Sequence, residues 1–412
     1  MYATTRPSLR RKSWSAKWPK NPMSSRLRAA RYTKNCEPNG ENGSNESGQV
    51  SAQCVAGAEV MRQVAVVGAG ILGRLLAWKL SAQGYVVTLF DKGSRDGETT
   101  AARVAASMLA PYTEVASAER QVFDWGLMAL RWWPEQIAAL EAQTGRAVSY
   151  GLDGSVVVAH ELDKSTLQHF QQQLRAVVPD YIERVERIDA ERLTELEPEL
   201  APRFRDGLFL PDEGYLDNGA LLAALADAIE QQGVCWQPHS EVTDIAPHSL
   251  RVNGQAQTFD CVVDTRGVGA RDALPELRGV RGEVLWLRAP EVSLSRPVRL
   301  MHPRYKLYVA PRPDHRYVIG ATEIESESMA PVTVRSHLEL LSALYSLHSG
   351  FAEATVEHAW SHCRPAMPNN LPIVRGQHGL LTVNGLYRHG YLLSPYVVET
   401  ALQAFERDCW ES

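Results

Sequence analysis

The clearest hydrophobic pattern in the chain begins just after residue 62. An uninterrupted apolar run, 63–67, leads into a Gly-x-Gly-x-x-Gly turn, Gly68–Gly73. The next segment, 71–83, has apolar residues at helical spacing, and a second apolar run, Tyr85–Phe90, ends at Asp91. This order predicts a strand, a glycine turn, a helix, a second strand and an acid.

Each part of this unit suits the binding of a dinucleotide. Gly68 permits the tight turn, Gly70 lets the backbone approach a pyrophosphate, and Gly73 lets the helix pack on the strand. The helix start offers free N–H groups and partial positive charge to phosphates. Asp91 can accept hydrogen bonds from ribose hydroxyls. The unit therefore predicts a dinucleotide site.

Further along the chain, the pattern changes from mixed helix and strand to nearly continuous strand and back. A small, polar segment, Glu98–Leu109, has the composition that lets backbone lie against a ligand. A helix is expected from Asn218, as its N-cap, to Gly233. Other expected helices are 117–143, 334–347 and 391–405, and the expected strands include 148–160, 207–210, 241–245, 261–264, 283–287, 298–301, 305–310 and 317–322.

Residues 1–60 have a different composition from the rest. They carry ten Lys/Arg and four Asp/Glu, so the remainder is −11 in a chain of net charge −5. The segment resembles a transit peptide in its basic, acid-poor start, but an over-extended start codon before Met61 is the simpler interpretation. An acidic body argues against nucleic acid and anionic membrane as partners.

Cysteines and apolar runs exclude several other classes. The six cysteines are scattered and form no Cys-x-x-Cys pair, so neither a disulfide framework nor a metal site is expected. No run approaches the roughly twenty apolar residues of a membrane helix. A reducing cytoplasm fits this chain.

Four motifs in order resemble the D-amino-acid oxidase superfamily of FAD amine oxidases, and most of all its glycine oxidases of thiamine biosynthesis. The resemblance covers about 350 residues from Arg62 onward. The motifs are 67–73; 99–111; Val280-Arg-Gly-Glu283 with Tyr308-Val-Ala-Pro-Arg312 and Ile319-Gly-Ala-Thr322; and Cys363-Arg-Pro-Ala-Met-Pro368 with Gly385–Pro395.

The resemblance implies non-covalent FAD and a set of residues around it. The glycines and the start of the helix would meet the pyrophosphate, Asp91 and Lys92 the adenosine ribose, and Val242 the adenine. The segment 99–108 would follow the ribityl chain and flavin, and 386–392 would present N–H groups to the flavin pyrimidine oxygen. The implied cofactor residues are Gly68, Gly70, Ile71, Leu72, Gly73, Asp91, Lys92, Thr99, Thr100, Ala106, Ser107, Met108, Val242, Leu386, Tyr387, Arg388, His389, Gly390, Tyr391 and Leu392.

The resemblance also implies where the substrate binds. Arg364 would hold an amino-acid carboxylate by two parallel hydrogen bonds. Arg388 and Tyr308 are the other expected substrate residues, and no residue is required as a general acid or base. Glu323, where the relatives carry an apolar residue, would favour a small or amine-bearing substrate if it faces the pocket.

The fold class implied is mixed α/β: a Rossmann-like FAD-binding domain with an inserted, mainly antiparallel substrate domain. The expected FAD-binding domain comprises 61–149, 212–280 and 355–412, and the substrate-binding domain comprises 150–211 and 281–354. A ligand cleft between discontinuous domains follows from this interleaving.

The expected reaction is oxidative deamination of glycine or another small amine, with hydride transfer to FAD and O2 as acceptor. It would supply iminoacetate for the thiazole of thiamine. Two alternatives stay open: a D-amino-acid or sarcosine dehydrogenase that passes electrons to a quinone or carrier, and an FAD-binding subunit of a larger complex. A homo-oligomer is compatible with each.

Overall fold

The first predicted strand lies in the middle of a parallel sheet. The structure, a computed structural model, describes residues 61–304 and 306–410. In its six-stranded sheet the order is β19-β20-β13-β1-β2-β9, and β19 is the antiparallel strand at one edge. The strands are β1 (Gln63–Val67), β2 (Val86–Phe90), β9 (Cys235–Gln237), β13 (Cys261–Asp264), β19 (Ile373–Gln377) and β20 (Leu380–Asn384).

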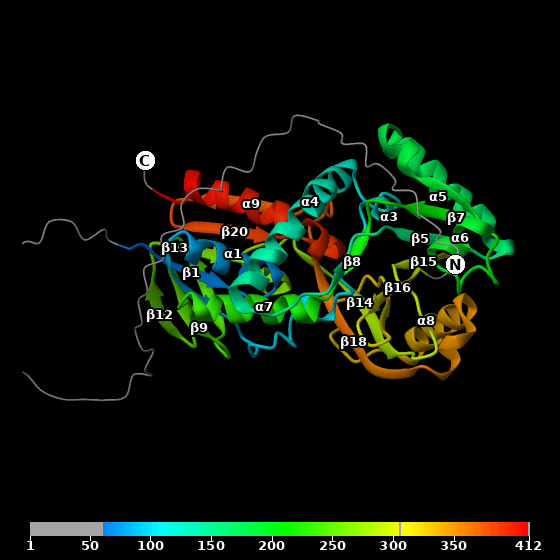
Figure 1. Ribbon diagram of the computed structural model, residues 1–412. Helices are drawn as coiled ribbons and strands as arrows, with labels where there is room; N and C mark the ends of the chain where they lie inside the picture. Colours follow the sequence, from blue (N-terminus) through cyan, green and yellow to red (C-terminus); the bar gives the residue numbers. More distant parts are fainter. Residues whose placement is uncertain (1–60, 305, 411–412) are drawn as a thin grey trace, which may run out of the picture. The chain divides into compact units, whose positions relative to one another are not determined.

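The strand-rich middle of the chain forms an eight-stranded sheet of order β18-β14-β17-β16-β15-β5-β7-β6. Its pairs are antiparallel except β15 with β5. Figure 1 shows the sheet beside α8 and α6. The strands are β5 (Ser155–Ala159), β6 (Glu186–Asp189), β7 (Asp206–Leu210), β14 (Arg278–Arg288), β15 (Val298–Met301), β16 (Lys306–Arg312), β17 (Arg316–Gly320) and β18 (Thr355–Ala366).

Two three-stranded sheets and the helices complete the described part of the chain. One small sheet has the order β3-β8-β4 and the other β10-β11-β12. Their strands are β3 (Met108–Leu109), β4 (Tyr150–Gly151), β8 (Gly214–Leu216), β10 (Val242–Ala246), β11 (Ser249–Val252) and β12 (Gln255–Thr258). The α-helices are α1 (Ile71–Ala82), α2 (Ala101–Val104), α3 (Pro111–Glu114), α4 (Arg120–Thr144), α5 (Lys164–Val177), α6 (Ala190–Leu196), α7 (Asn218–Gln231), α8 (Val334–Leu347) and α9 (Gly390–Asp408).

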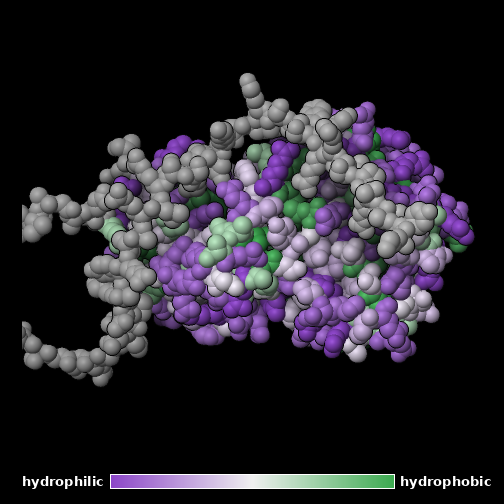
Figure 2. Space-filling view, viewed as in Figure 1, coloured by the Kyte–Doolittle hydropathy of each residue, from purple (hydrophilic) through white to green (hydrophobic). Residues whose placement is uncertain are grey.

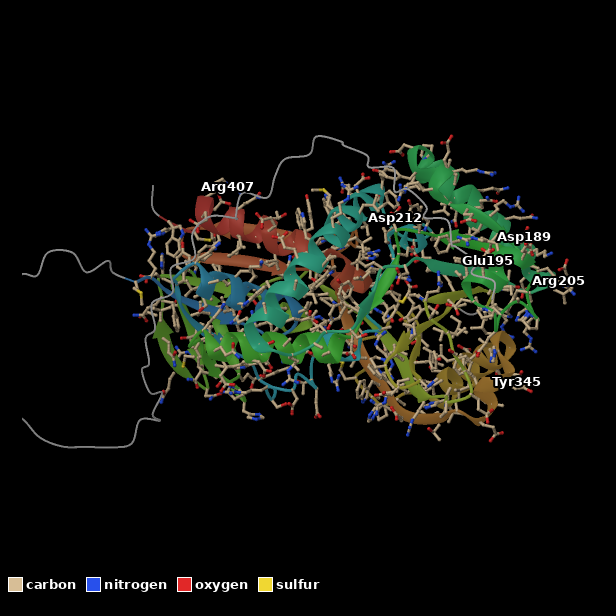
Figure 3. The ribbon with its side chains drawn as sticks, in the orientation of Figure 1. Asp189, Glu195, Arg205, Asp212, Tyr345 and Arg407 are labelled. Atoms are coloured by element: carbon tan, nitrogen blue, oxygen red, sulfur yellow. The ribbon has the colours of Figure 1, made fainter. Side chains whose placement is uncertain are left out.

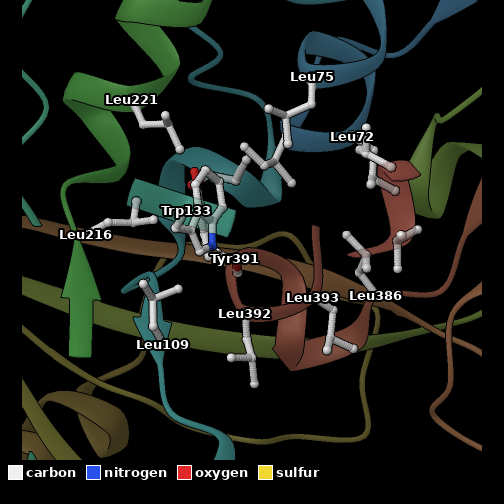
Figure 4. Packing of buried hydrophobic residues seen from close by; sticks show 14 of the residues in the cluster. Leu72, Leu75, Leu109, Trp133, Leu216, Leu221, Leu386, Tyr391, Leu392 and Leu393 are labelled. Atoms are coloured by element: carbon white, nitrogen blue, oxygen red, sulfur yellow. Dashed lines mark hydrogen bonds between the residues drawn. The ribbon is translucent and has the colours of Figure 1, made fainter. Parts of the chain in front are cut away.

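The largest core cluster packs α1, α4, α7 and α9 against one face of the six-stranded sheet. Trp133 of α4 is fully buried and donates its ring N–H to the Tyr391 carbonyl, 2.9 Å away. Figure 4 shows this pair among leucines from α1, α7 and α9. This packing fixes the start of α9, which the sequence places at a cofactor. A second cluster lies between the eight-stranded sheet and α8.

The predicted start of α7 is wrong by one residue. Asp217, and not Asn218, is the N-cap, and its carboxylate accepts from the Ala220 N–H. Asn218 instead donates its amide to the carbonyls of Ala102, Arg103 and Ala105 at 2.9–3.0 Å. Those carbonyls lie at the end of α2, where helical partners are missing. Either side chain can cap, so tertiary contacts decided between them.

The mixed α/β fold class is confirmed, whereas the domain boundaries stay a prediction. The last FAD-binding segment was expected to begin at 355, which is the first residue of β18. β18 pairs with β14 along its length, from Arg278↔Ala366 to Arg288↔Thr355. Both strands therefore belong to the eight-stranded sheet. The expectation for residues 1–60 lies outside the described residues.

The face shown in Figure 2 is mostly hydrophilic. Charged side chains such as Asp189, Glu195, Arg205 and Arg407 project from it in Figure 3. Among the described helices, none is both long and apolar enough to cross a membrane.

Candidate active site

The predicted glycine turn opens onto a cavity of about 650 Å³. Its walls come from both ends and the middle of the described chain: the glycine turn, the 98–108 segment, strands of the eight-stranded sheet and the segment before α9. Every residue that the sequence predicted for the cofactor or substrate lines this cavity except Gly73. The sequence prediction therefore converges on one place.

The glycine turn is built as the sequence predicts, and each glycine has its own reason. Gly68 has φ +98°, a conformation that favours glycine. A Cβ on Gly73 would overlap the Gly68 carbonyl, which explains its absence from the cavity wall. A Cβ on Gly70 would meet no protein atom within 4 Å. The open space at Gly70 is where a pyrophosphate would approach the start of α1.

Asp91 has a role in this turn that the sequence did not predict. One carboxylate oxygen accepts from the Ala69 N–H at 2.5 Å and the other from the Gly93 N–H at 2.7 Å. Asp91 thus fixes the glycine turn. Each oxygen has a second lone pair, so the carboxylate can still accept from a ribose.

Arg364 is on β18, the strand at one edge of the eight-stranded sheet. Its guanidinium donates to the carbonyls of Thr322 and Arg281 at 3.2–3.3 Å. Within the described residues it has no carboxylate partner at ion-pair distance, and burial lowers its pKa. A half-buried cation held only by carbonyls is suited to receive an anion.

Gly282 explains why the guanidinium can lie there. A Cβ on Gly282 would overlap the Arg364 guanidinium atoms. The glycine of the Val280-Arg-Gly-Glu motif therefore leaves the space in which the Arg364 guanidinium lies.

We expect Gly282→Ala to displace the Arg364 guanidinium and to lower kcat/KM by about tenfold or more. A displaced guanidinium can no longer hold the substrate carboxylate by two parallel hydrogen bonds. Bound FAD should be retained. Gly279→Ala on the same strand is the matched control, since its Cβ would meet Cys363 Cβ at 3.2 Å and not Arg364. Steady-state kinetics with equal losses in both variants would contradict this role of Gly282.

Arg388 is already paired with carboxylates from two segments. Its Nε lies 2.8 Å from Glu114 and its Nη1 3.1 Å from Glu323. Glu323 also accepts from the Tyr387 hydroxyl at 2.5 Å. Burial acts to raise the pKa of Glu114, but Arg388 and His389 outweigh it and lower that pKa to about 2. Arg388 is thus less suited than Arg364 to receive a carboxylate.

Tyr308 and His389 flank these charges. The Tyr308 hydroxyl lies over Gly320, where a built Cβ would be 3.0 Å from it. His389 is buried at the start of α9, with Nδ1 3.1 Å from Glu114. Tyr387, two residues earlier, has φ +49°. The segment therefore turns sharply before α9 and directs the helix start at the cavity.

Four residues of the cavity wall were missed by the sequence reasoning: Glu114, Glu213, Gly282 and Arg299. Gly282 lay in a motif, but nothing local showed what it contacts. The other three are single charges that meet only in the folded chain. No cluster of three or more His, Cys, Asp or Glu suited to a metal occurs in the described part.

Glu213 is fully buried in this wall. It accepts from Ser155 Oγ at 2.5 Å and from the Thr113 N–H at 2.7 Å. Burial raises its pKa from 4.5 to about 7, against these two hydrogen bonds.

The folded protein therefore holds a proton on Glu213 that the unfolded chain releases between pH 4.5 and 7. Stability is lost as the pH rises through this range, by an amount on the order of 3 kcal/mol for such a shift. We expect Glu213→Gln to remove this loss, so that its free energy of unfolding changes less from pH 5 to pH 8. Denaturant unfolding at both pH values measures it. The same pH dependence in variant and wild type would contradict the assignment.

Comparison with known proteins agrees with this geometry. Residues 63–401 match the FAD dependent oxidoreductase family, DAO. A protein of Rhizobium etli named thiamine biosynthesis oxidoreductase ThiO is 40% identical over 334 residues, 81% of this chain and 93% of that protein. A glycine oxidase of Geobacillus kaustophilus is 28% identical over 348 residues, 81% and 89% of the two chains.

The crystal structure of glycine oxidase from Geobacillus kaustophilus superposes with a TM-score of 0.74 at 26% identity, covering 85% of this chain and 96% of that one. The match to the family spans most of the chain, and the relative from Rhizobium etli is similar over nearly its whole length. The chain therefore belongs to the DAO family of FAD dependent oxidoreductases.

Proposed function

We propose that this protein oxidises glycine or another small amino acid with FAD, and so supplies iminoacetate for the thiazole of thiamine. The observation that carries the proposal is Arg364, a half-buried guanidinium with only carbonyl partners in the cavity that the dinucleotide turn opens onto. Relatives named glycine oxidase and thiamine biosynthesis oxidoreductase support the substrate and the pathway.

The residues present fit FAD. The space at Gly70 is open, the start of α1 faces it, and Lys92 and Val242 line the same cavity. Bound FAD would supply the hydride acceptor, and the N–H groups at the start of α9 would stabilise negative charge on its pyrimidine ring.

The flavin is proposed to be non-covalent. Cys363 is the cysteine in the cavity wall, but it is buried, with its Sγ 3.7 Å from the Ser326 carbonyl. Burial also raises the pKa of this thiol. A protonated thiol is a poor nucleophile.

The protein itself would bind and orient. Arg364 would hold the substrate carboxylate in two hydrogen bonds, and Tyr308 would close one side of the site. The Cα–H would then point at the flavin, which is the main requirement of a hydride transfer. Arg388 would keep Glu114 and Glu323 neutralised beside the substrate.

The division into domains is also a proposal. The FAD-binding part would comprise 61–149, 212–277 and 367–412, and the substrate-binding part 150–211 and 278–366. The two sheets and the length of the β14–β18 pairing support the change from the sequence prediction. A cytoplasmic location and a homo-oligomer stay predictions.

One experiment tests the function. Purified protein is mixed anaerobically with glycine, sarcosine, D-alanine or D-proline, and flavin bleaching is followed before air is admitted. Bleaching by glycine, followed by reoxidation with H2O2 formation, is expected. Turnover with an artificial dye but not with air would favour a dehydrogenase, and no bleaching with any substrate would reject the proposal.

A further inference from the structure

A third cation faces the cavity in addition to Arg364 and Arg388. Arg299, on β15, lines it and is half-buried. Its Nη1 donates a hydrogen bond to the Thr113 carbonyl, at 3.1 Å. A guanidinium has five N–H donors, so most of those of Arg299 remain for another acceptor.

In the described part of the chain, no carboxylate lies within 4 Å of the Arg299 guanidinium. Glu114 and Glu213 are the carboxylates whose charges act on it from farther away, and Arg388 repels it. Glu114 is bound by Arg388 and His389. Glu213 is bound by Ser155 and Thr113. Both acids are thus engaged elsewhere.

Strand register places Arg299 relative to the substrate. Arg299 is directly opposite Tyr308 on β16, and Tyr308 is directly opposite Gly320 on β17. Arg364 reaches the same end of β17, at the Thr322 carbonyl. Neighbouring strands are about 4.8 Å apart, so Arg299 begins roughly 10 Å from Gly320 and, one strand further, roughly 15 Å from Gly282, against which the Arg364 guanidinium lies. A side chain from that position reaches part of the way back.

The wall of the cavity also includes residues on the Arg299 side of Tyr308. Past Tyr308 its wall is formed by Leu307, Val298, Pro297 and Ser155, which belong to or adjoin β16, β15 and β5. These residues lie on the side away from Arg364. A substrate larger than glycine can therefore extend from Arg364 toward Arg299.

We propose that Arg299 forms a second anion-binding subsite, which takes the distal carboxylate of an amino acid that has two acidic groups. This rests on the proposed function, because Arg364 must hold the first carboxylate. Arg299 keeps most of its donors for such an acid, because the carboxylates nearest to it, Glu114 and Glu213, are bound by other groups.

The test uses the holoenzyme and matched substrates. D-Aspartate and D-glutamate carry the second carboxylate at the end of the side chain on Cα, and iminodiacetate carries it on a CH2 group attached to nitrogen. D-Asparagine and D-glutamine are the neutral isosteres of the first two. We expect at least one diacid to be a better substrate, or a better competitor of glycine, than its neutral analogue, by about tenfold or more in kcat/KM or in affinity. The neutral analogue is the amide for D-aspartate and D-glutamate, and sarcosine for iminodiacetate. Which diacid succeeds shows where the second acid is attached.

Variants of Arg299 then identify the residue responsible. Arg299→Met should lower kcat/KM or the affinity for the diacid by about fiftyfold, with glycine oxidation within about threefold of wild type. Arg299→Lys should recover part of the loss, because it keeps the charge. Equal losses for glycine and diacid would overturn the proposal and assign Arg299 a structural role.

The wild-type comparison decides the matter even if these variants do not fold. Glycine oxidation with no preference for any diacid over its neutral analogue overturns the subsite and leaves the proposed function intact. Flavin that no amino acid reduces rejects the proposed function itself.

Discussion

Arg364→Ala is expected to lower kcat/KM for glycine by roughly a hundred- to several-thousand-fold while FAD stays bound. The substitution removes a charge-assisted, two-point contact to a desolvated carboxylate, a loss on the order of 3–5 kcal/mol of transition-state stabilisation. Anaerobic flavin reduction by glycine measures it directly. Arg388 is no ready replacement, since it is held by Glu114 and Glu323.

Two variants make this result specific. Arg364→Lys should recover only part of the rate, because an ammonium cannot reproduce the planar grip. Arg375→Ala is a control, since Arg375 is an exposed arginine paired with Glu276 outside the cavity wall. If Arg364→Ala reduces its flavin within about tenfold of wild type, a loss of only about 1.4 kcal/mol, then Arg388 becomes the better candidate.

Gly70→Val and Gly73→Ala are expected to fail for different reasons. At Gly70 the added side chain enters open space, so the protein should fold but remain colourless because the pyrophosphate position is filled. At Gly73 the added Cβ meets the Gly68 carbonyl, and backbone cannot move aside cheaply. That overlap should cost about 3 kcal/mol of stability, with or without FAD.

Visible absorbance and FAD release report binding, and denaturant unfolding of the FAD-free proteins reports stability. Wild-type protein stripped of FAD is the reference. A yellow Gly70→Val protein would show that the dinucleotide lies elsewhere. A Gly73→Ala protein as stable as the reference would show that α1 can shift away from the turn.

The sequence predicted those parts of the site that are contiguous in the chain. The glycine turn and Asp91 lie within one strand-helix-strand unit, so spacing alone defines their geometry. Arg364 was predicted from a family resemblance, because no local pattern distinguishes it from a surface arginine. The contact of its guanidinium with Gly282 could not be predicted, since that contact depends on the register of β14 with β18.

The sequence did not predict the contacts of charged residues with partners far away in the chain. Glu114 meets Arg388 from a helix almost three hundred residues earlier in the chain, and Glu213 meets Ser155, which is 58 residues earlier. The N-cap of α7 shows the same limit at short range. Asp217 and Asn218 are both good capping residues, and contacts of Asn218 with α2 decided between them.

The way the cavity wall is assembled has a consequence for the amount of protein in a cell. Its residues run from Val67 to Leu392, so an occupant contacts segments from both ends and from the middle of the described chain at once. A ligand that binds only the native state stabilises it by mass action, by about 2.7 kcal/mol at a hundredfold excess over Kd. Scarcity of FAD would therefore lower the enzyme's lifetime before it limited turnover, and abundance would follow cofactor supply.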